Sequence, residues 1–456
     1  MKIFRKIIWG VVALLILGVV LAFVVIRPVD YTPYFQTGYY AKTMTNLRAV
    51  DAALPHTKPA PLFVGFGKAS ITPPVGTPLA GYGDRKGKPS VGVHDSLFVR
   101  AIALKSGGQE AILVAGDILI VPRQLADSVL AEIHPKLGID RRQILFGATH
   151  SHSAVGAWGT TWLEEQFAGK NDPKILHFLI RQFVAAIEQA TAHFERAEVG
   201  WGNFHAPGLI RNRLIGKKGW TDDQAVFTAF RTDSGKQIVL VSFGAHATVL
   251  PASNFLISAD YPGYLERKLE RALPGHCVFF AGGVGSHRPA GKGKDFDRAK
   301  MIGEALADSV LFHLKTTSFH ANVPLLPVGV PVALPSYTIR ISDNLRLAPF
   351  LAAKILKERD TFFNAVLLGK EIFIGIPAEL SGEIGLVLKA LAFEKGLQLV
   401  PTSFNGSYLG YVVPGKYYHY NAYESRLMSF YGPYMGDYFE EIARRLLLVA
   451  WHHTQR

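Results

Sequence analysis

A run of twenty residues without a charge, 7–26, constrains the fold of this chain more than any other feature. At a rise of 1.5 Å per residue, a helix of that length spans the roughly 30 Å hydrocarbon core of a membrane. Three basic residues precede the run, whereas Arg27 and then Asp30 follow it. The positive-inside rule therefore predicts a cytoplasmic tail over 1–6, a single-pass transmembrane signal anchor over 7–26, and a body in the periplasm or the extracellular space.

The alternative is a long signal peptide that is removed after export. Signal peptides usually have an apolar region of about 7–15 residues and a small-residue cleavage site. Here the run ends in residues 23–28, FVVIRP, which contain no such site. The uncleaved anchor is therefore the favoured prediction.

The rest of the chain divides into a linker, residues 27–61, and one large domain, residues 62–456. The linker contains a short helix over 41–54, and its proline-rich end, PHTKPAP, favours an extended spacer. From Leu62 onward, short apolar runs alternate with helical patterns, which predicts an α/β fold with a mixed or parallel sheet flanked by helices. Strands are expected at 98–104, 111–115, 144–148, 237–243, 277–281 and 372–376. Helices are expected at 122–134, 173–190, 264–272, 296–315, 348–357 and 379–394.

Charge and cysteine content restrict the classes of partner and site. The net charge is +13, of which four charges flank the predicted anchor and nine remain on the body. That excess suits an anionic membrane surface. Nucleic acid is disfavoured because the basic residues are scattered and an exported domain seldom meets DNA. Cys277 is the only cysteine, so a thiolate metal site and an intrachain disulfide are excluded, and its apolar neighbours predict a buried side chain.

Histidines follow two of the predicted strands. His150 and His152 lie in residues 147–153, GATHSHS, and His246 lies in residues 242–248, SFGAHAT. Side chains at i and i+2 share one face of an extended segment, so the first two imidazoles can address one point. Imidazole suits zinc, and a catalytic zinc ion commonly takes three protein ligands and one water. An H-x-H pair alone is equally compatible with an ordinary polar loop.

Two further segments carry polar groups at positions of interest. Glu379 follows the strand over 372–376 at the expected start of a helix, where a carboxylate taken alone is expected to complement the helix dipole. The second segment, residues 408–431, is rich in tyrosine at a spacing that fits neither a helix face nor a strand face. These phenols are therefore predicted to line a pocket.

Together these segments resemble the neutral/alkaline non-lysosomal ceramidases over about residues 62–440. The resemblance is carried by the order and spacing of several motifs rather than by any one of them. They are residues 64–74 (VGFGKASITPP), 81–83 (GYG), 149–153 (THSHS), 211–214 (RNRL), His246, 258–264 (SADYPGY), 377–379 (PAE), and the tyrosine segment that ends in 431–433 (YGP).

The resemblance implies a zinc amidase that cleaves the N-acyl bond of ceramide into a fatty acid and a sphingoid base. It implies one Zn²⁺ per chain, with His150, His246, Glu379 and Tyr411 as ligands. It further implies that His152 contacts the substrate or the oxyanion, that Arg213 approaches the substrate, and that Tyr423 lies near the scissile amide. Tyrosine is an unusual zinc ligand, so a hydrogen-bond donor or a proton shuttle is an alternative role for Tyr411.

Three features depart from the family pattern. The segment in which the family has a serine with an assigned catalytic role corresponds to residues 285–289, GSHRP, and places Arg288 at the serine position. Ser286 is then the nearest candidate for a catalytic hydroxyl. The C-terminal β-sandwich of the family is not expected, because the chain stops shortly after Tyr431. The anchor replaces secretion, and tethering raises the effective concentration of the site at a lipid substrate.

We therefore expect a divergent, membrane-anchored member of the family that consists of the catalytic domain alone. Its expected reaction is zinc-dependent hydrolysis of ceramide, or of a related long-chain N-acyl lipid, at the membrane surface. One alternative is another amide, such as an N-acyl amino lipid or a lipoprotein N-terminus, with acyl transfer included. A second is a catalytically silent lipid-binding protein, which the altered serine segment favours and the retained ligand types disfavour.

Overall fold

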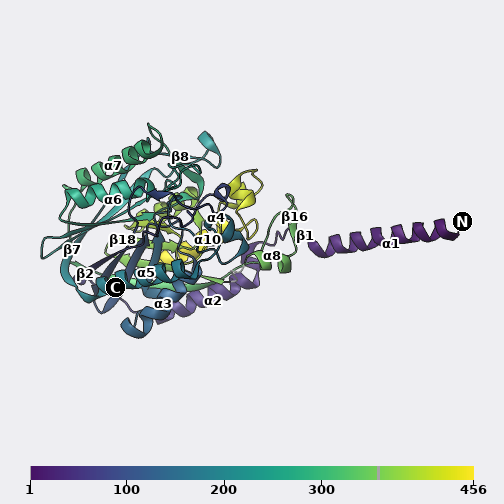
Figure 1. Cartoon of the computed structure of the whole chain (residues 1–456). Helices are drawn as coiled ribbons and strands as arrows, with labels where there is room; N and C mark the ends of the chain where they lie inside the picture. Colours follow the sequence, from purple (N-terminus) through teal and green to yellow (C-terminus); the bar gives the residue numbers. More distant parts are fainter. Residues whose placement is uncertain (1, 357–359, 456) are drawn as a thin grey trace.

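The computed structural model describes residues 2–356 and 360–455. A single long helix, α1 (Lys2–Val25), projects from a body that contains the rest of the chain (Figure 1). Its segment Phe4–Val25 is exposed, and it is long and apolar enough to cross a membrane, which fits a signal anchor and a signal peptide alike. Directly after α1, strand β1 (Ile26–Pro28) pairs antiparallel with β16 (Leu345–Leu347) of the body.

Two sheets lie at the centre of the described part of the chain. The larger has nine strands in the order β12-β10-β9-β7-β2-β4-β5-β6, with β14 paired to β2. It is antiparallel except at its two ends, where β5 pairs parallel with β6 and β10 pairs parallel with β12. Its strands are β2 (Ala60–Ser70), β4 (Phe98–Ser106), β5 (Gln109–Gly116), β6 (Ile144–Ala148), β7 (Glu195–His205), β9 (Gln224–Thr232), β10 (Gln237–Phe243), β12 (Gly275–Ala281) and β14 (Asn322–Val323).

The smaller sheet has four strands in the order β15-β17-β18-β20. These are β15 (Leu325–Ala333), β17 (Asp360–Leu368), β18 (Glu371–Ile376) and β20 (Gln398–Ser403). The structure thus confirms a mixed α/β fold flanked by helices. The helices of the body are α2 (Gly38–Ala53), α3 (Arg123–Leu137), α4 (Trp162–Ala168), α5 (Pro173–Ala192), α6 (Asp260–Ala272), α7 (Asp295–Leu314), α8 (Pro349–Ile355), α9 (Gly382–Glu394) and α10 (Met435–His452).

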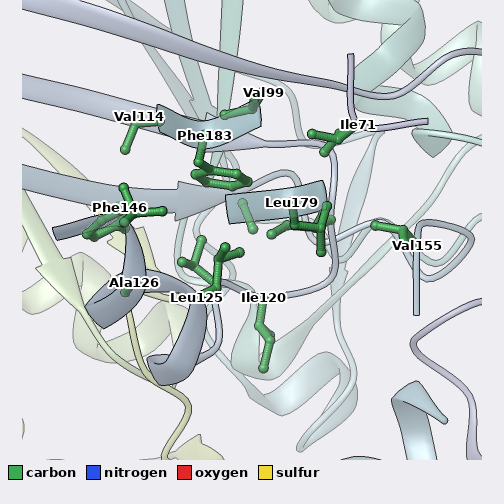
Figure 2. Close-up of a cluster of buried hydrophobic side chains, with 14 of the residues drawn as sticks. Ile71, Val99, Val114, Ile120, Leu125, Ala126, Phe146, Val155, Leu179 and Phe183 are labelled. Carbon is green, nitrogen blue, oxygen red and sulfur yellow. The ribbon is translucent and has the colours of Figure 1, made fainter. Parts of the chain in front are cut away.

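The layers follow from the two-residue alternation of side chains along each strand. In β4, Ala101 and Ala103 face α3 and α5, whereas Ile102 and Leu104 belong to a core shared by the two sheets. Helices α6 and α7 cover another part of the outer face of the large sheet, and α2, α9 and α10 cover the small sheet. The body is therefore built of helix, sheet, sheet and helix layers. Figure 2 shows Leu125 of α3 and Phe183 of α5 in the core beneath the large sheet.

Curvature of the large sheet brings its two edge strands together. Residues of both β6 and β12 belong to the core between the sheets. A Cβ atom added at Gly147 of β6 would lie 2.1 Å from Cδ1 of Phe280 in β12, so the contact requires glycine there. Strand β10 is the neighbour of β12 in the sheet, whereas β6 is at the opposite edge. The contact between the two edges consequently brings the carboxyl ends of β6 and β10 into one region of the molecule.

The apolar patterns located most of the elements that they predicted. Strands β6 and β10 have the predicted bounds, and the other four predicted strands and five of the helices differ from prediction by a few residues. For the predicted helix over 348–357, α8 ends at Ile355 and Lys357 lies outside the described residues. The helix predicted from 379 begins instead at Gly382. The lone Cys277 is buried, as predicted.

The apolar pattern did not predict strand β2, because glycines interrupt that pattern. Gly65 and Gly67 permit α5 to pack directly on the strand, since a Cβ atom at either position would lie 1.9 Å from a backbone carbonyl oxygen of that helix. The segment expected as a linker carries α2, whose Met44 and Leu47 are buried in the core over the small sheet. The domain boundaries stay a prediction.

Candidate metal centre and active site

His150 occupies a turn directly after β6. Its φ is +61°, a left-handed conformation that is uncommon for a residue with a side chain and often marks functional sites. Its backbone N–H donates to Ile118 O at 3.0 Å, and its ring Nδ1 lies 2.7 Å from Leu119 O. The segment is therefore not extended at His150, which corrects the premise that His150 and His152 share one strand face. A turn, rather than strand alternation, directs the imidazole.

His246 is delivered to the same region by β10. Its side chain is fully buried, and Nδ1 lies 2.8 Å from Val284 O and 3.1 Å from His287 O. Carbonyl oxygens only accept hydrogen bonds, so in both His150 and His246 the Nδ1 atom carries the proton and Nε2 presents a lone pair. A histidine that donates from one nitrogen to a backbone carbonyl is held as metal-binding histidines are held.

Glu379 lies in a short strand, β19 (Glu379–Leu380), and not in a helix. Strand β19 pairs parallel with β21 (Tyr411–Val412), so Glu379 stands opposite Tyr411 in the register. Helix α9 starts three residues later and is capped by Ser381, which rules out the expected helix-dipole role for Glu379. Instead its Oε2 lies 2.9 Å from His246 Nε2 and 3.7 Å from His150 Nε2. The hydroxyl of Tyr408 donates to the other oxygen, Oε1, at 2.8 Å.

Three buried atoms that can each donate an electron pair thus converge: Nε2 of His150, Nε2 of His246 and Oε2 of Glu379. Burial and the Arg213 guanidinium together lower the pKa of His246 to about 3, so its imidazole is neutral. Burial alone would raise the pKa of Glu379, but the two histidines hold it well below its ordinary value. A cation held between these three buried atoms would be bound by two imidazole nitrogens and one carboxylate oxygen. The residues present therefore fit a metal ion.

His152 approaches the same point from the solvent side. Its Nε2 lies 3.3 Å from His150 Nε2, and ligand atoms of His150, His152 and His246 all lie within 4.8 Å of one another. Its side chain is half-buried, and its Nδ1 has no hydrogen-bond partner among residues 2–356 and 360–455. His152 thus shares the cluster but lacks the carbonyl contact that holds the other two rings.

Arg213 links the cluster to the tyrosine segment. Its Nη2 donates to the Tyr411 hydroxyl at 2.9 Å, and its Nε lies 2.6 Å from Oε1 of Glu424. The Tyr411 hydroxyl is 3.2 Å from His246 Nε2. Burial raises the pKa of Tyr411 well above its ordinary value. Burial alone would lower the pKa of Arg213, but Tyr411 and Glu424 raise it, so this guanidinium stays charged.

Tyr423 stands where the cluster meets solvent. Its ring packs edge-on against Tyr411, with ring centroids 5.6 Å apart, and its side chain is 51% exposed. His150, His246 and Glu379, by contrast, are at most 3% exposed. The cluster is therefore open on the side of Tyr423, His152 and Arg213 and closed on the other sides.

Ser286 is not brought to this cluster. Its hydroxyl accepts hydrogen bonds from the Gly382 N–H at 3.0 Å and from the Ser381 hydroxyl at 3.2 Å, which occupies it at the start of α9. Arg288, at the position of the family serine, lies on β13 (His287–Pro289) with an exposed side chain. Ser286 acts on the site only through its backbone carbonyl, which accepts from the Arg213 N–H at 2.8 Å.

Three residues support the cluster in roles that the sequence did not predict. Tyr408 holds Glu379, Glu424 holds Arg213, and buried Arg85 donates to the backbone carbonyls of His152 and Ala252. Tyr408 and Glu424 belong to the recognised tyrosine segment, but nothing in their spacing indicates their partners. Arg85 follows the GYG motif by two residues, and the sequence pattern there predicts an exposed arginine.

Known proteins resemble this chain in both sequence and fold. The model of the N-terminal domain of neutral/alkaline non-lysosomal ceramidases matches residues 62–282. Neutral ceramidase of Pseudomonas aeruginosa is 25% identical over 237 residues, which cover 48% of this chain and 35% of that protein.

Two solved structures share the fold. A crystal structure of the Pseudomonas aeruginosa neutral ceramidase superimposes with a TM-score of 0.73 at 19% identity, over 87% of this chain and 75% of that one. A ceramidase complexed with C2 gives a TM-score of 0.71 at 19% identity, over 87% of this chain and 76% of that one. Residues 62–282 of this chain therefore match the N-terminal domain of the neutral/alkaline non-lysosomal ceramidase family.

Proposed function

We propose that this protein is a zinc-dependent amidase that hydrolyses the N-acyl bond of ceramide, or of a related long-chain N-acyl lipid, and releases a fatty acid. The convergence of His150 Nε2, His246 Nε2 and Glu379 Oε2 carries the proposal, because three buried lone-pair donors can together bind a cation. The family relationship supplies the class of reaction. One Zn²⁺ per chain is the proposed cofactor, since it accepts both imidazole and carboxylate ligands.

The contacts favour His150, His246 and Glu379 as zinc ligands. Both histidines donate from Nδ1 to backbone carbonyls, which directs Nε2 inward. Tyr411, whose hydroxyl lies 3.2 Å from His246 Nε2, is the proposed fourth ligand. His152 is left to contact the substrate, because its ring lacks a backbone carbonyl partner and borders the open side. If His152 is instead the third histidine ligand, His152→Ala weakens zinc binding more than Tyr411→Phe does.

The side chains around the cluster suit the steps of amide hydrolysis. A bound zinc ion lowers the pKa of water to about 7 and polarises an amide carbonyl. As water adds to the carbonyl carbon, the carbonyl oxygen gains negative charge, and the cationic Arg213 is placed to donate to it. One donor of this kind contributes roughly 3 kcal/mol to the transition state. When the C–N bond breaks, the amine nitrogen takes up a proton, and His152, whose Nε2 borders the cluster, is the proposed group to deliver it.

The location of the protein is part of the proposal. Helix α1 is proposed as a signal anchor with its basic end in the cytoplasm, which leaves the amidase body in the periplasm or the extracellular space. A tethered amidase stays beside its lipid substrate, and the net positive body favours anionic lipid surfaces. Nucleic acid is not proposed as a partner.

Metal analysis and deacylation test the proposal together. Purified full-length protein in detergent is expected to contain one zinc ion per chain and to release fatty acid from ceramide, as measured by mass spectrometry. His150→Ala and Glu379→Ala are expected to abolish both zinc retention and deacylation. His177→Ala, which alters an exposed histidine on α5, serves as the control and leaves both unchanged. Full deacylation by a variant that retains no zinc would refute the proposal.

A different amide on the same site is the second candidate. It is favoured by the position of Ser286, whose hydroxyl is engaged at α9, and by the exposed Arg288 at the position of the family serine. A panel of N-acyl sphingoid bases, N-acyl amino acids and N-terminal lipopeptides, each tested with and without an amine acceptor, ranks the substrates and detects acyl transfer. Zinc retention without turnover of any lipid would instead indicate a silent lipid-binding protein.

A further inference from the structure

The apolar helix α1 is joined to the body without a free spacer. Strand β1 begins at the residue after α1, and its Ile26, Arg27 and Pro28 pair with β16. The Val25 carbonyl accepts from the Ala348 N–H at 2.7 Å, and the Val29 N–H donates to Asn344 O at 2.9 Å. The end of α1 therefore has a fixed position on the body, where Figure 1 shows β1, β16 and α8 together.

The same junction supports the loop that carries Tyr423. Tyr31, three residues after β1, donates to Asn344 Oδ1 at 3.0 Å and stacks on His419, with centroids 6.1 Å apart. Arg426 forms an ion pair with Asp343 at 2.7 Å. Residues on both sides of Tyr423 thus contact the segments that hold the end of α1. The loop on the open side of the metal centre is therefore connected to the point where α1 joins the body.

Exposed apolar and aromatic side chains gather on these segments. We define the junction surface as Tyr31 (38% exposed), Ile341 (50%), Leu345 (41%), Phe350 (55%), Tyr420 (47%) and Leu427 (67%). Single exposed apolar residues are ordinary, whereas a group of them on segments that contact one another is a candidate interaction surface. Arginine side chains of 27, 346 and 426 lie among them, as is typical of residues at the level of lipid headgroups.

We propose that the junction surface rests in the interfacial layer of the bilayer that α1 crosses, so that the mouth at Tyr423 opens toward lipid. We assign the bilayer as the partner of this surface because the surface adjoins a helix that is apolar enough to span a membrane. The pairing of β1 with β16 also leaves no free linker between that helix and the surface. The contact with lipid does not depend on catalysis. The entry of substrate from the membrane rests on the proposed function.

Labelling of single cysteines tests the contact with lipid. Cys277 is fully buried, so it will not react, and Leu427→Cys and Phe350→Cys each provide one reactive site for the environment-sensitive dye NBD. The matched control is Phe393→Cys on α9, which is 82% exposed. Phe393 lies near Lys395, whose Nζ is 4.9 Å from the ring of Trp451 beside the C-terminus, at the end of the body away from α1 (Figure 1).

Full-length protein is reconstituted into vesicles of phosphatidylcholine and phosphatidylserine. We expect NBD at 427 and at 350 to emit at shorter wavelength than NBD at 393 and to be quenched at least twofold by headgroup spin-labelled lipid. Emission and quenching at 427 and 350 equal to those at 393 would overturn the proposal, even if α1 is inserted. The same measurements on the His150→Ala background keep this test separate from catalysis, because contact with lipid requires no turnover.

A second measurement addresses entry of the substrate. Leu427→Asp is expected to raise the KM for ceramide in vesicles at least fivefold while leaving kcat within twofold, and Phe393→Asp is expected to change neither. Equal effects on vesicle-borne and detergent-dispersed ceramide would show a general loss of function and would count against entry from the membrane.

Discussion

Removal of one hydroxyl next to the cluster should weaken zinc binding by a predictable factor. Tyr408 donates to Oε1 of Glu379 at 2.8 Å, which leaves Oε2 directed at the two histidines. Tyr408→Phe removes that donor and keeps the ring in place. A hydrogen bond to a charged acceptor contributes about 1.5–3 kcal/mol, and about 1.4 kcal/mol corresponds to tenfold in an equilibrium constant. We therefore expect zinc to bind about 10- to 100-fold more weakly, the range found for residues that hold metal ligands.

Competition with a chromogenic zinc chelator measures this change on full-length protein. Tyr420→Phe is the matched control, because Tyr420 lies in the same tyrosine segment with a side chain that is 47% exposed. Thermal unfolding of each variant in its zinc-bound form shows that the body is folded. A zinc Kd for Tyr408→Phe within twofold of the original, or an equal loss in Tyr420→Phe, would refute the argument that Tyr408 positions Glu379.

Three further predictions concern stability. Burial raises the pKa of Glu371 to about 8, so the folded state keeps a proton that the unfolded chain releases near pH 4.5, and stability falls as the pH rises from there to 8. Glu371→Gln should remove up to about 1.4 kcal/mol per pH unit from that slope, as measured by urea unfolding at several pH values. Arg85→Met leaves carbonyls such as those of His152 and Ala252 without a donor and should lower the free energy of unfolding by roughly 3 kcal/mol; a loss below 1 kcal/mol would contradict it. A chelator should lower the Tm of the original protein and leave that of His150→Ala unchanged, because only a folded site gains from bound zinc.

Local sequence patterns located the histidines with respect to their strands. Strand β6, which precedes His150, and β10, which precedes His246, consist of apolar runs that are buried on both faces, and such runs are visible in the sequence. Glu379 was found at the end of a similar run, but the local pattern alone favoured a helix-dipole role, and only the family resemblance implied a metal ligand. A carboxylate before a helix has the same local pattern whether it caps the helix or joins a site, and only the pairing of β19 with β21 separates the two cases.

The segment around Ser286 shows the opposite limit. Its sequence provides a hydroxyl close to the position of the family serine, yet in the structure this hydroxyl accepts a hydrogen bond from the first N–H group of α9. Which neighbour a short polar side chain binds depends on the packing of residues 286 and 382, almost a hundred positions apart. No spacing rule covers that distance, because spacing describes one element at a time.

By itself, the sequence determined the apolar helix, the α/β class, the strands that deliver the histidines and the family. The first three depend on side-chain periodicity and composition, which act over a few neighbouring residues, whereas the family resemblance depends on the order and spacing of motifs along the chain. The resemblance implied that His150, His246 and Glu379 meet, and the tertiary structure showed the contacts that bring them together. The tertiary structure alone decided that Tyr408, Arg85 and Glu424 hold the site and that the end of α1 is fixed on the body. Those contacts depend on the curvature that joins β6 to β12 and on two short strand pairings, β19–β21 and β1–β16. Their energies come from groups far apart in the chain, and only the folded body brings those groups within reach.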